Sequence, residues 1–216
     1  SRRFEFIFLG PGGHSFGAFG LPSAIHAMGR AIAYIAELQT PRFPRTTFTV
    51  GTVTGGTSVN SIAADATFAI DMRSNNSESL AIFERQAKQA ALTAVLEENS
   101  RWDSDAISVN FRLIGDRPVG STSVESPIVQ VAAGAYAKLG VDIGGITISS
   151  TDSNVPMALG IPAITISGGG DGGGAHSPAE WFKPVNSYLG PQAVLINILT
   201  LVGISGVSTP VLADDF

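Results

Sequence analysis

Histidines are the first residues to consider for chemistry in this sequence, because imidazole can bind metals, transfer protons and donate hydrogen bonds. The chain has three: His14, His26 and His176. His14 follows two glycines just beyond a predicted strand, and glycines there would let a ligand approach the backbone. His176 ends a glycine-rich loop after an apolar segment, and such loops of α/β sheets bind ligands. His26 lies within an amphipathic helical pattern, so we interpret it as an ordinary surface or half-buried residue.

Ser15 offers a different chemistry. The segment Gly13-His14-Ser15-Phe16-Gly17 matches the G-x-S-x-G pattern of α/β-hydrolases, and Ser15, Asp152 and His176 follow the family's serine, acid, histidine order. That pattern needs the serine at a sharp turn from a strand into a helix. Two glycines and a proline delay the next helix until about Ser23. A serine hydrolase that uses Ser15 therefore stays an alternative and is not the leading hypothesis.

Two further features favour ordinary structural roles. Glu97-Glu98 is the one Glu-Glu pair in the chain, and paired carboxylates can bind metals or transfer protons. It lies near the end of a long amphipathic helix with no histidine nearby, so we interpret it as a solvated helix face. The glycine tract at 168–174 lacks the lysine of a phosphate-binding loop.

The first half of the chain alternates between strand and helix patterns. Aromatic and β-branched residues predict strands at 3–9, 46–54, 62–72 and 107–114. Three- and four-residue apolar spacing predicts helices at 23–38 and 77–99, the second with Ser77 as its N-cap. The order β-α-β-β-α-β is ferredoxin-like, and it predicts a first domain over residues 1–115.

The second half, residues 116–216, has fewer strand patterns. We predict helices at 127–139, 151–159 and 188–202, and strands at 144–149 and 162–167. Two strands are too few for an independent α/β domain, so we expect this segment to complete a larger sheet with strands upstream of Ser1. Because Ser1-Arg2-Arg3 runs directly into a strand, we expect the chain to be a piece of a longer protein.

Composition excludes several classes of function. There are 13 Lys and Arg against 18 Asp and Glu, with no basic cluster, so nucleic acid is excluded as a partner. The absence of cysteine excludes disulfides and thiolate metal sites. No apolar run approaches the roughly 18 residues that a membrane span needs, so we expect no membrane partner.

Six motifs in order resemble the dinuclear-zinc metallopeptidase family that includes peptidase T, glutamate carboxypeptidase and aminoacylase. The motifs are Gly10-Pro11-Gly12-Gly13-His14-Ser15, Gly55-Gly56-Thr57-Ser58-Val59-Asn60, Asp71-Met72-Arg73, Gly115-Asp116-Arg117-Pro118, Ser150-Thr151-Asp152-Ser153-Asn154 and His176-Ser177-Pro178-Ala179-Glu180-Trp181. The resemblance implies an α/β protein: a ferredoxin-like lid and dimerisation domain, followed by the C-terminal part of an α/β catalytic domain. It also favours a cytoplasmic location.

The resemblance implies a role for five residues. His14 matches a lid histidine that, in dimers of this family, reaches the neighbouring subunit's site and helps to hold the oxyanion of the tetrahedral intermediate. Asn60 and Arg73 match lid residues that contact the substrate near the same site. Arg117 matches an arginine that binds a substrate carboxylate, a group that suits its planar fork of donors. His176 matches the last of the family's zinc ligands.

The sequence departs from the family in its metal ligands. The remaining ligands of the two zinc ions should come from a His-x-Asp motif, a bridging Asp, a Glu-Glu pair and a further acidic residue, all upstream of the His14 motif. This chain holds none of them there, so we expect that it does not bind the zinc pair alone. The leading hypothesis is part of a homodimeric zinc-dependent peptidase or amidohydrolase that cleaves short peptides or N-acyl amino acids. A non-catalytic dimerisation module is the other alternative.

Overall fold

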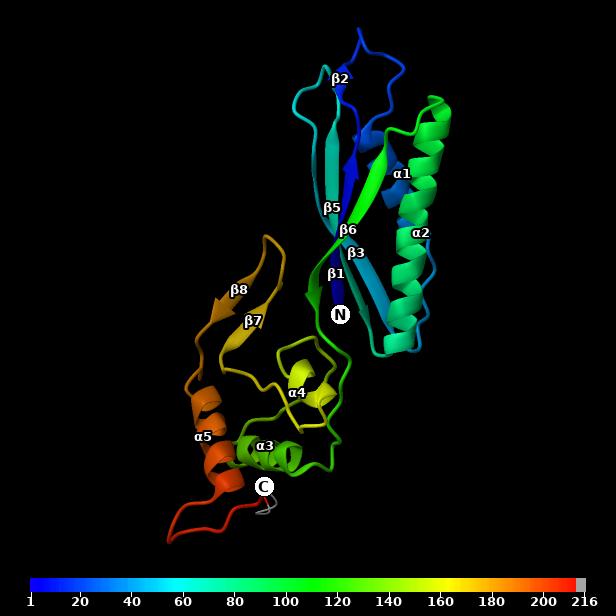
Figure 1. Ribbon diagram of the computed structural model, residues 1–216. Helices are drawn as coiled ribbons and strands as arrows, with labels where there is room; N and C mark the ends of the chain where they lie inside the picture. Colours follow the sequence, from blue (N-terminus) through cyan, green and yellow to red (C-terminus); the bar gives the residue numbers. More distant parts are fainter. Residues whose placement is uncertain (213–216) are drawn as a thin grey trace. The chain divides into compact units, whose positions relative to one another are not determined.

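The computed structural model describes residues 1–212 of the chain. The chain forms two compact units, Ser1–Val119 (unit 1) and Gly120–Phe216 (unit 2) (Figure 1). Strand β6 continues to Asp116, so unit 1 ends a few residues beyond that strand.

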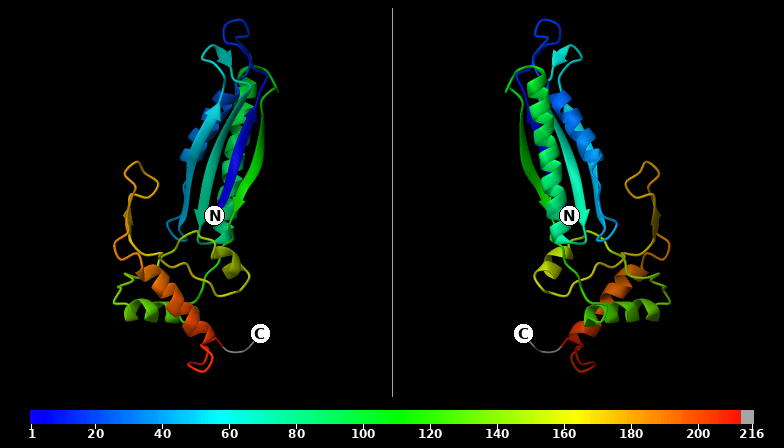
Figure 2. Two further views of the ribbon diagram at one scale, coloured as in Figure 1. Left: turned by 90° about the vertical axis from the view of Figure 1, so that its left-hand side faces the viewer. Right: turned by 90° about the vertical axis from the view of Figure 1, so that its right-hand side faces the viewer.

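Unit 1 is built on a four-stranded antiparallel sheet with the order β3-β5-β1-β6. Its strands are β1 (Arg2–Leu9), β3 (Thr46–Gly55), β5 (Asp65–Ser74) and β6 (Ser108–Asp116). Helices α1 (Ala24–Ala36) and α2 (Ser77–Arg101) pack against one another and lie on one face of this sheet (Figure 2). The predicted ferredoxin-like β-α-β-β-α-β order is confirmed.

A second, two-stranded sheet departs from the prediction. Strands β2 (Gly13–His14) and β4 (Ser61–Ile62) pair with each other beyond the end of the main sheet (Figure 1). The predicted strand at 62–72 is therefore two strands, because the chain breaks between Ile62 and Asp65.

Buried and less buried residues alternate along β1 and β5, and the buried ones form the core of unit 1. Phe4, Phe6 and Phe8 on β1 are buried, whereas the residues between them are not. Phe6 stacks on Phe68 of β5 with ring centroids 4.7 Å apart. Burying each such side chain contributes about 1.5–3 kcal/mol, and a slip of one residue would turn the whole set toward solvent.

The N-cap of helix α2 lies one residue earlier than predicted, and the helix itself begins at Ser77. The N-cap is Asn76, whose side chain accepts a hydrogen bond from the Ser79 N–H at 2.8 Å. The prediction of Ser77 as N-cap is wrong because Asn76 has the extended backbone that a cap needs, and Ser77 is already helical.

Unit 2 contains the three predicted helices and a hairpin that was not predicted. The helices are α3 (Pro127–Lys138), α4 (Asn154–Ala158) and α5 (Leu189–Val202), and the hairpin pairs β7 (Asp171–Gly173) with β8 (Trp181–Lys183).

The segments predicted as strands, 144–149 and 162–167, form no strand here, because neither joins a ladder with any described part of the chain; their predicted partners lie upstream of Ser1. The second segment is held by side chains of its own unit. The Thr122 hydroxyl bonds both backbone groups of Ala163, and the Tyr136 hydroxyl donates to the Ser167 carbonyl at 3.1 Å. Apolar, β-branched composition predicts a strand, but a strand also needs a partner for its backbone.

Within residues 1–212, no helix has both the length and the apolar character to cross a membrane.

Candidate functional site

The short β2–β4 sheet brings His14 and Asn60 together. Gly13 and His14 pair with Ile62 and Ser61 in antiparallel register. The Ser15 N–H donates to the Asn60 carbonyl at 2.9 Å. Two residues that are far apart in sequence therefore lie side by side at one end of unit 1.

The packing of the chain around His14 requires the glycines that precede it. Gly12 has φ +68°, and a Cβ there would lie 3.0 Å from the Cβ of Ala64. A Cβ on Gly13, whose φ is +157°, would lie 2.9 Å from the Cβ of Ala18. The nearest neighbours of these glycines are Ala64, just before β5, and Ala18, in the loop that carries His14.

The imidazole of His14 is oriented by its own loop. Its Nδ1 accepts the backbone N–H of Phe16 at 3.3 Å and that of Gly17 at 3.2 Å. The Ala18 N–H donates to the His14 carbonyl at 2.9 Å, which closes the turn. Two donors at Nδ1 require a lone pair there, so the proton of the neutral ring lies on Nε2. His14 is exposed and offers an oriented N–H donor at Nε2.

Asn60 is oriented in a similar way. The Ser58 hydroxyl donates to its Oδ1 at 2.5 Å, which leaves the NH₂ group as the donor side of the amide. His14 and Asn60 thus place two hydrogen-bond donors at the same exposed end of unit 1.

Arg73 lies at the opposite end of strand β5 from this pair. Strand β5 starts beside β4 at Asp65, and eight residues at about 3.3 Å each place Arg73 roughly 25 Å further along. Its Nε donates to Asp71 at 2.5 Å, and Arg3 donates to the same carboxylate at 2.8 Å. Burial raises the pKa of Asp71, but hydrogen bonds from Arg3 and Arg73 outweigh it and hold that pKa below its usual value. A single copy of the chain therefore does not bring Arg73 to His14.

Arg117 lies at the same end of the sheet as Arg73. Its backbone N–H donates to the Ser1 carbonyl at 2.8 Å, and the Ser1 nitrogen donates back to the Arg117 carbonyl at 2.8 Å. These bonds extend the β1–β6 ladder by one pair, so the backbone of Arg117 is fixed where the sheet ends.

His176 lies in unit 2, in the loop that joins β7 to β8. It has the left-handed φ of 63°, which is uncommon for a residue other than glycine. Its backbone N–H donates to the Glu180 carboxylate at 3.2 Å, and the Ser177 N–H donates to the Gly174 carbonyl at 3.0 Å.

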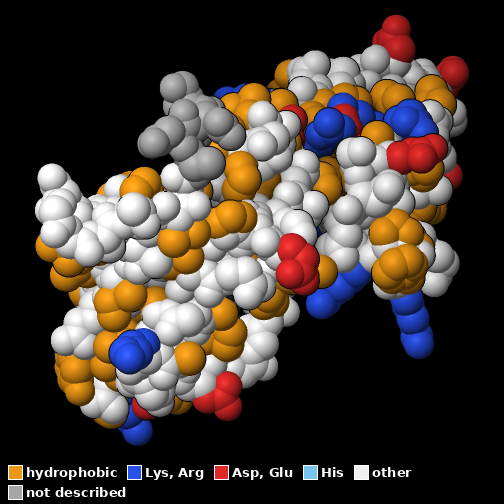
Figure 3. Space-filling model, turned by 90° about the horizontal axis from the view of Figure 1, so that it is seen from below, with side chains coloured by type: hydrophobic (Ala, Val, Ile, Leu, Met, Phe, Trp, Pro, Cys, Tyr) orange, Lys and Arg blue, Asp and Glu red, His pale blue; other side chains and the backbone are white. Residues whose placement is uncertain are grey.

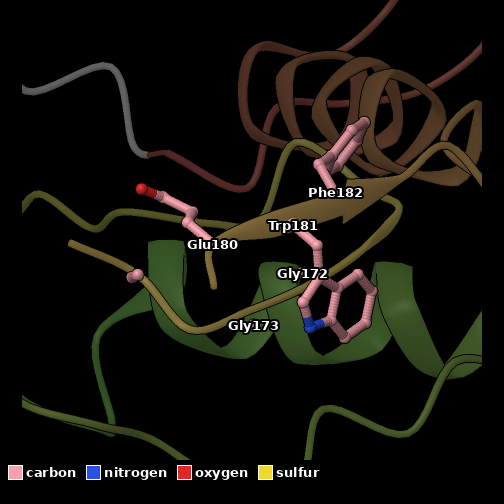
Figure 4. Close-up of a pocket in the computed structure, with 6 residues that line it drawn as sticks. Gly172, Gly173, Glu180, Trp181 and Phe182 are labelled. Carbon is pink, nitrogen blue, oxygen red and sulfur yellow. The ribbon is translucent and has the colours of Figure 1, made fainter. Parts of the chain in front are cut away.

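An open hollow lies beside this loop, along the hairpin of β7 and β8 (Figure 4). Its lining combines glycine backbone, two aromatic side chains and one carboxylate: Gly172, Gly173, Ala175, Glu180, Trp181 and Phe182. His176 is thus held by backbone and carboxylate contacts at the rim of an open, mostly apolar surface.

The donors present do not fit a pair of zinc ions. Among residues 1–212, no three His, Cys, Asp or Glu side chains gather where they could hold a metal ion. A two-metal site needs several carboxylates and imidazoles that converge on ions about 3.5–4 Å apart. His176 can contribute one imidazole to such a site.

The geometry around Ser15 does not fit a nucleophile elbow. Ser15 follows the two-residue strand β2, which is antiparallel to β4, and α1 starts only at Ala24. The elbow needs a parallel strand that turns at once into a helix.

Glu98 overturns the interpretation of the Glu97-Glu98 pair as a solvated face. Glu97 is exposed and accepts a hydrogen bond from the Tyr34 hydroxyl. Glu98 is 0% exposed, and its Oε1 accepts the Ser23 N–H and the Trp102 Nε1–H, each at 3.1 Å. The signal was present in the sequence, because Glu98 continues the buried three- and four-residue spacing of α2.

Residues 1–99 match the family model described as a peptidase dimerisation domain. A comparison with proteins of curated function finds no match. Residues 1–99 are therefore similar to peptidase dimerisation domains, and the predicted resemblance is confirmed for this part of the chain.

Solved structures share the fold of the chain. A tripeptidase from Staphylococcus aureus subsp. aureus Mu50 is similar with a TM-score of 0.67 and 20% identity, over 91% of this chain and 50% of that one. Aminopeptidase PepT from Bacillus cereus ATCC 10987 has a TM-score of 0.61 and 21% identity, with the same two coverages. A hydantoinase/carbamoylase family amidase from Burkholderia vietnamiensis has a TM-score of 0.66 and 16% identity, over 92% and 46%. The chain thus spans about half the length of these structures.

The geometry at Nδ1 predicts the tautomer of His14. We expect ¹⁵N-resolved spectra of the imidazole at neutral to alkaline pH to show a protonated Nε2 and an unprotonated Nδ1, because two backbone N–H groups occupy Nδ1. His26 provides the internal comparison: its Nδ1 lies 3.5 Å from the Glu98 carboxylate, so the proton of its neutral ring should lie on Nδ1. A protonated Nδ1 on the neutral ring of His14 would contradict this arrangement.

Proposed function

We propose that this chain is the lid and dimerisation domain, with the C-terminal part of the catalytic domain, of a zinc-dependent hydrolase that cleaves short peptides or N-acyl amino acids. The observation that carries the proposal is an oriented histidine donor at the exposed end of a peptidase dimerisation domain. The tripeptidase, aminopeptidase and amidase with the same fold support hydrolysis of a peptide or amide bond.

Each predicted residue has a role in this proposal. The Nε2–H of His14 donates to the oxyanion that forms on the substrate carbonyl in the neighbouring copy's site, where positioned donors stabilise charge that develops in the transition state. Asn60 adds its NH₂ group beside His14. Arg73 contacts the substrate, and its distance from His14 within one copy requires that the two act at different sites of a dimer. Arg117 binds the substrate carboxylate through its planar guanidinium.

His176 supplies one imidazole ligand to zinc in this proposal. The zinc pair, when bound, polarises the scissile carbonyl and lowers the pKa of a bound water. Because the described donors of this chain do not complete that site, the remaining ligands come from residues outside it. We therefore propose that the chain is inactive alone.

Exposed apolar side chains on unit 2 support the proposal that residues outside this chain cover part of its surface. Helix α5 buries only Gly190, Ala193 and Asn197, whereas Leu195 and Val202 are 56% and 59% exposed. Hydrophobic side chains reach the surface at many places on the face shown in Figure 3. Exposed apolar surface in such quantity favours a face that another part of a protein covers.

The edge of strand β3 is the surface that we propose for self-association. Its residues Thr46–Gly55 include no charged side chain, whereas the opposite edge strand β6 carries Arg112 and Asp116. Charges on an edge strand oppose pairing with another sheet, and a long uncharged edge permits it. A symmetric pair of β3 strands would join two copies as a homodimer, the commonest closed assembly.

A charge on β3 should weaken the dimer. Val53 is 54% exposed, so Val53→Lys is expected to fold and to lower the apparent molecular mass in light scattering by favouring the monomer. Leu113→Lys is the matched control, because Leu113 is 50% exposed on the other edge strand and should leave the dimer intact. Equal behaviour of the two variants would contradict the choice of β3.

Mixed dimers test whether His14 acts in the neighbouring copy. In the complete enzyme, His14→Ala should lower kcat about 10²–10³-fold through loss of an oxyanion donor, and His176→Ala should abolish activity through loss of a zinc ligand. Equal mixing of the two variants forms about half mixed dimers, each with one intact site, so about a quarter of the wild-type rate should return.

Three results, the first from the mixing experiment and the others from separate assays, distinguish the alternatives. A mixture as inactive as its components would place His14 in its own copy's site. Activity of the short chain alone that survives chelation, with Ser15 labelled by a fluorophosphonate, would favour a serine hydrolase. No hydrolysis of any peptide or acyl amino acid by the complete protein would favour a non-catalytic dimerisation module.

A further inference from the structure

Glu98 is the one acidic or basic side chain that is buried in the part of the chain that the structure describes. Burying a carboxylate is costly unless hydrogen bonds and charges compensate for the lost water. Its partners therefore indicate what it does.

The partners of Glu98 come from three segments. Its Oε1 accepts from the Ser23 N–H and the Trp102 Nε1–H, both at 3.1 Å, and its Oε2 accepts from the Arg30 Nε at 3.4 Å. The Nδ1 of His26 lies 3.5 Å from Oε1. The carboxylate thus joins the residue before α1, the first half of α1 and the end of α2.

This arrangement replaces a local helix cap. In a capping box, an acidic residue at the third helical position bonds back to the N–H of the cap residue. In α1 that position is His26, and the side chain of the N-cap residue Ser23 makes no capping bond. Glu98 of α2 takes the place of the missing acid, so the start of α1 is anchored to another helix.

Glu98 and its hydrogen-bond partners also fix the loop that carries His14. The loop is held at one end by the pairing of His14 with Ser61 and at the other by the bond from Ser23 to Glu98. Between these points, the ring of Phe19 meets the ring of Trp102 edge-on at 5.4 Å between centroids. Trp102 is also a donor to Glu98, so one carboxylate positions both anchors at the far end of the loop.

We propose that Glu98 is a positioning residue: by anchoring Ser23 and Trp102 it holds the loop in which the N–H groups of Phe16 and Gly17 orient the His14 imidazole. This inference rests on the function proposed for His14. It predicts that a buried acid at the end of α2 affects catalysis without contact with substrate, zinc or the reacting atoms.

The test removes the negative charge of Glu98 and keeps the shape of its side chain. Glu98→Gln retains an acceptor but introduces an NH₂ group opposite the donors Arg30 and Trp102, so the anchor loosens. In the complete enzyme we expect kcat to fall about tenfold with KM changed less than twofold, because a small displacement of a transition-state donor acts on the chemical step. Glu97→Gln is the matched control on the same turn and should leave both constants unchanged.

A double-mutant cycle separates positioning from general loss of stability. If Glu98 acts through His14, Glu98→Gln has no further effect on kcat in the His14→Ala background. A further tenfold loss in that background, with both proteins folded, would overturn the proposal. If Glu98→Gln does not fold, Trp102→Phe keeps the ring beside Phe19 and removes the Nε1 donor, and the same cycle applies.

A spectroscopic readout on the present chain is independent of activity. In Glu98→Gln, but not in Glu97→Gln, the amide shifts of Phe16 and Gly17 and the ring ¹⁵N shifts of His14 should change. Unchanged spectra would overturn the proposal. An active His14→Ala enzyme would instead overturn the function proposed for His14, while the spectra would still decide whether Glu98 positions the loop.

Discussion

The carboxylate of Glu98 is the interaction on which the His14 end of unit 1 depends. It is buried where water cannot solvate it, and the structure compensates with two hydrogen bonds at 3.1 Å and the guanidinium of Arg30. Because an unpaired buried charge is costly, each of these partners is constrained in turn. The start of α1, the end of α2 and the loop between His14 and Ser23 are therefore fixed as one group.

The sheet beneath this group supplies rigidity. Three phenylalanines of β1 and their partners on β5 form a core that allows one register. Beyond the main sheet, the segment after β1 forms β2 and the segment before β5 forms β4. Backbone pairing there holds His14 beside Asn60. The exposed loop that carries His14 is thus positioned by a packed sheet and a buried carboxylate.

Much of unit 1 could be predicted from the sequence. Alternation in β1 and three- and four-residue spacing in α1 and α2 are local signals, and they give the ferredoxin-like order directly. The burial of Glu98 follows the same spacing. Because acids seldom face a core, the Glu97-Glu98 pair nevertheless favours the interpretation of a solvated helix face. The β2–β4 pairing was missed because two-residue strands have no periodicity.

Unit 2 shows where sequence patterns stop being sufficient. Apolar runs at 144–149 and 162–167 predict strands, but a strand forms only where another strand accepts its backbone bonds. The hairpin of β7 and β8 was missed because glycine-rich segments resemble loops. Among the candidate site residues, proximity of His14 and Asn60 follows from pairing, whereas the separation of Arg73 follows from the length of β5, which motif order does not reveal.

The central claim is that His14 acts in the site of the neighbouring copy. Its most direct test is photo-crosslinking from the loop that carries His14. A photoreactive amino acid replaces Phe16, which is 89% exposed, in the complete enzyme, and labelled and unlabelled chains are mixed before irradiation. The account predicts crosslinks between this loop and the segment around His176 that join a labelled to an unlabelled chain. Crosslinks to that segment found only within one chain, or no crosslink to it in a folded dimer, would contradict the claim.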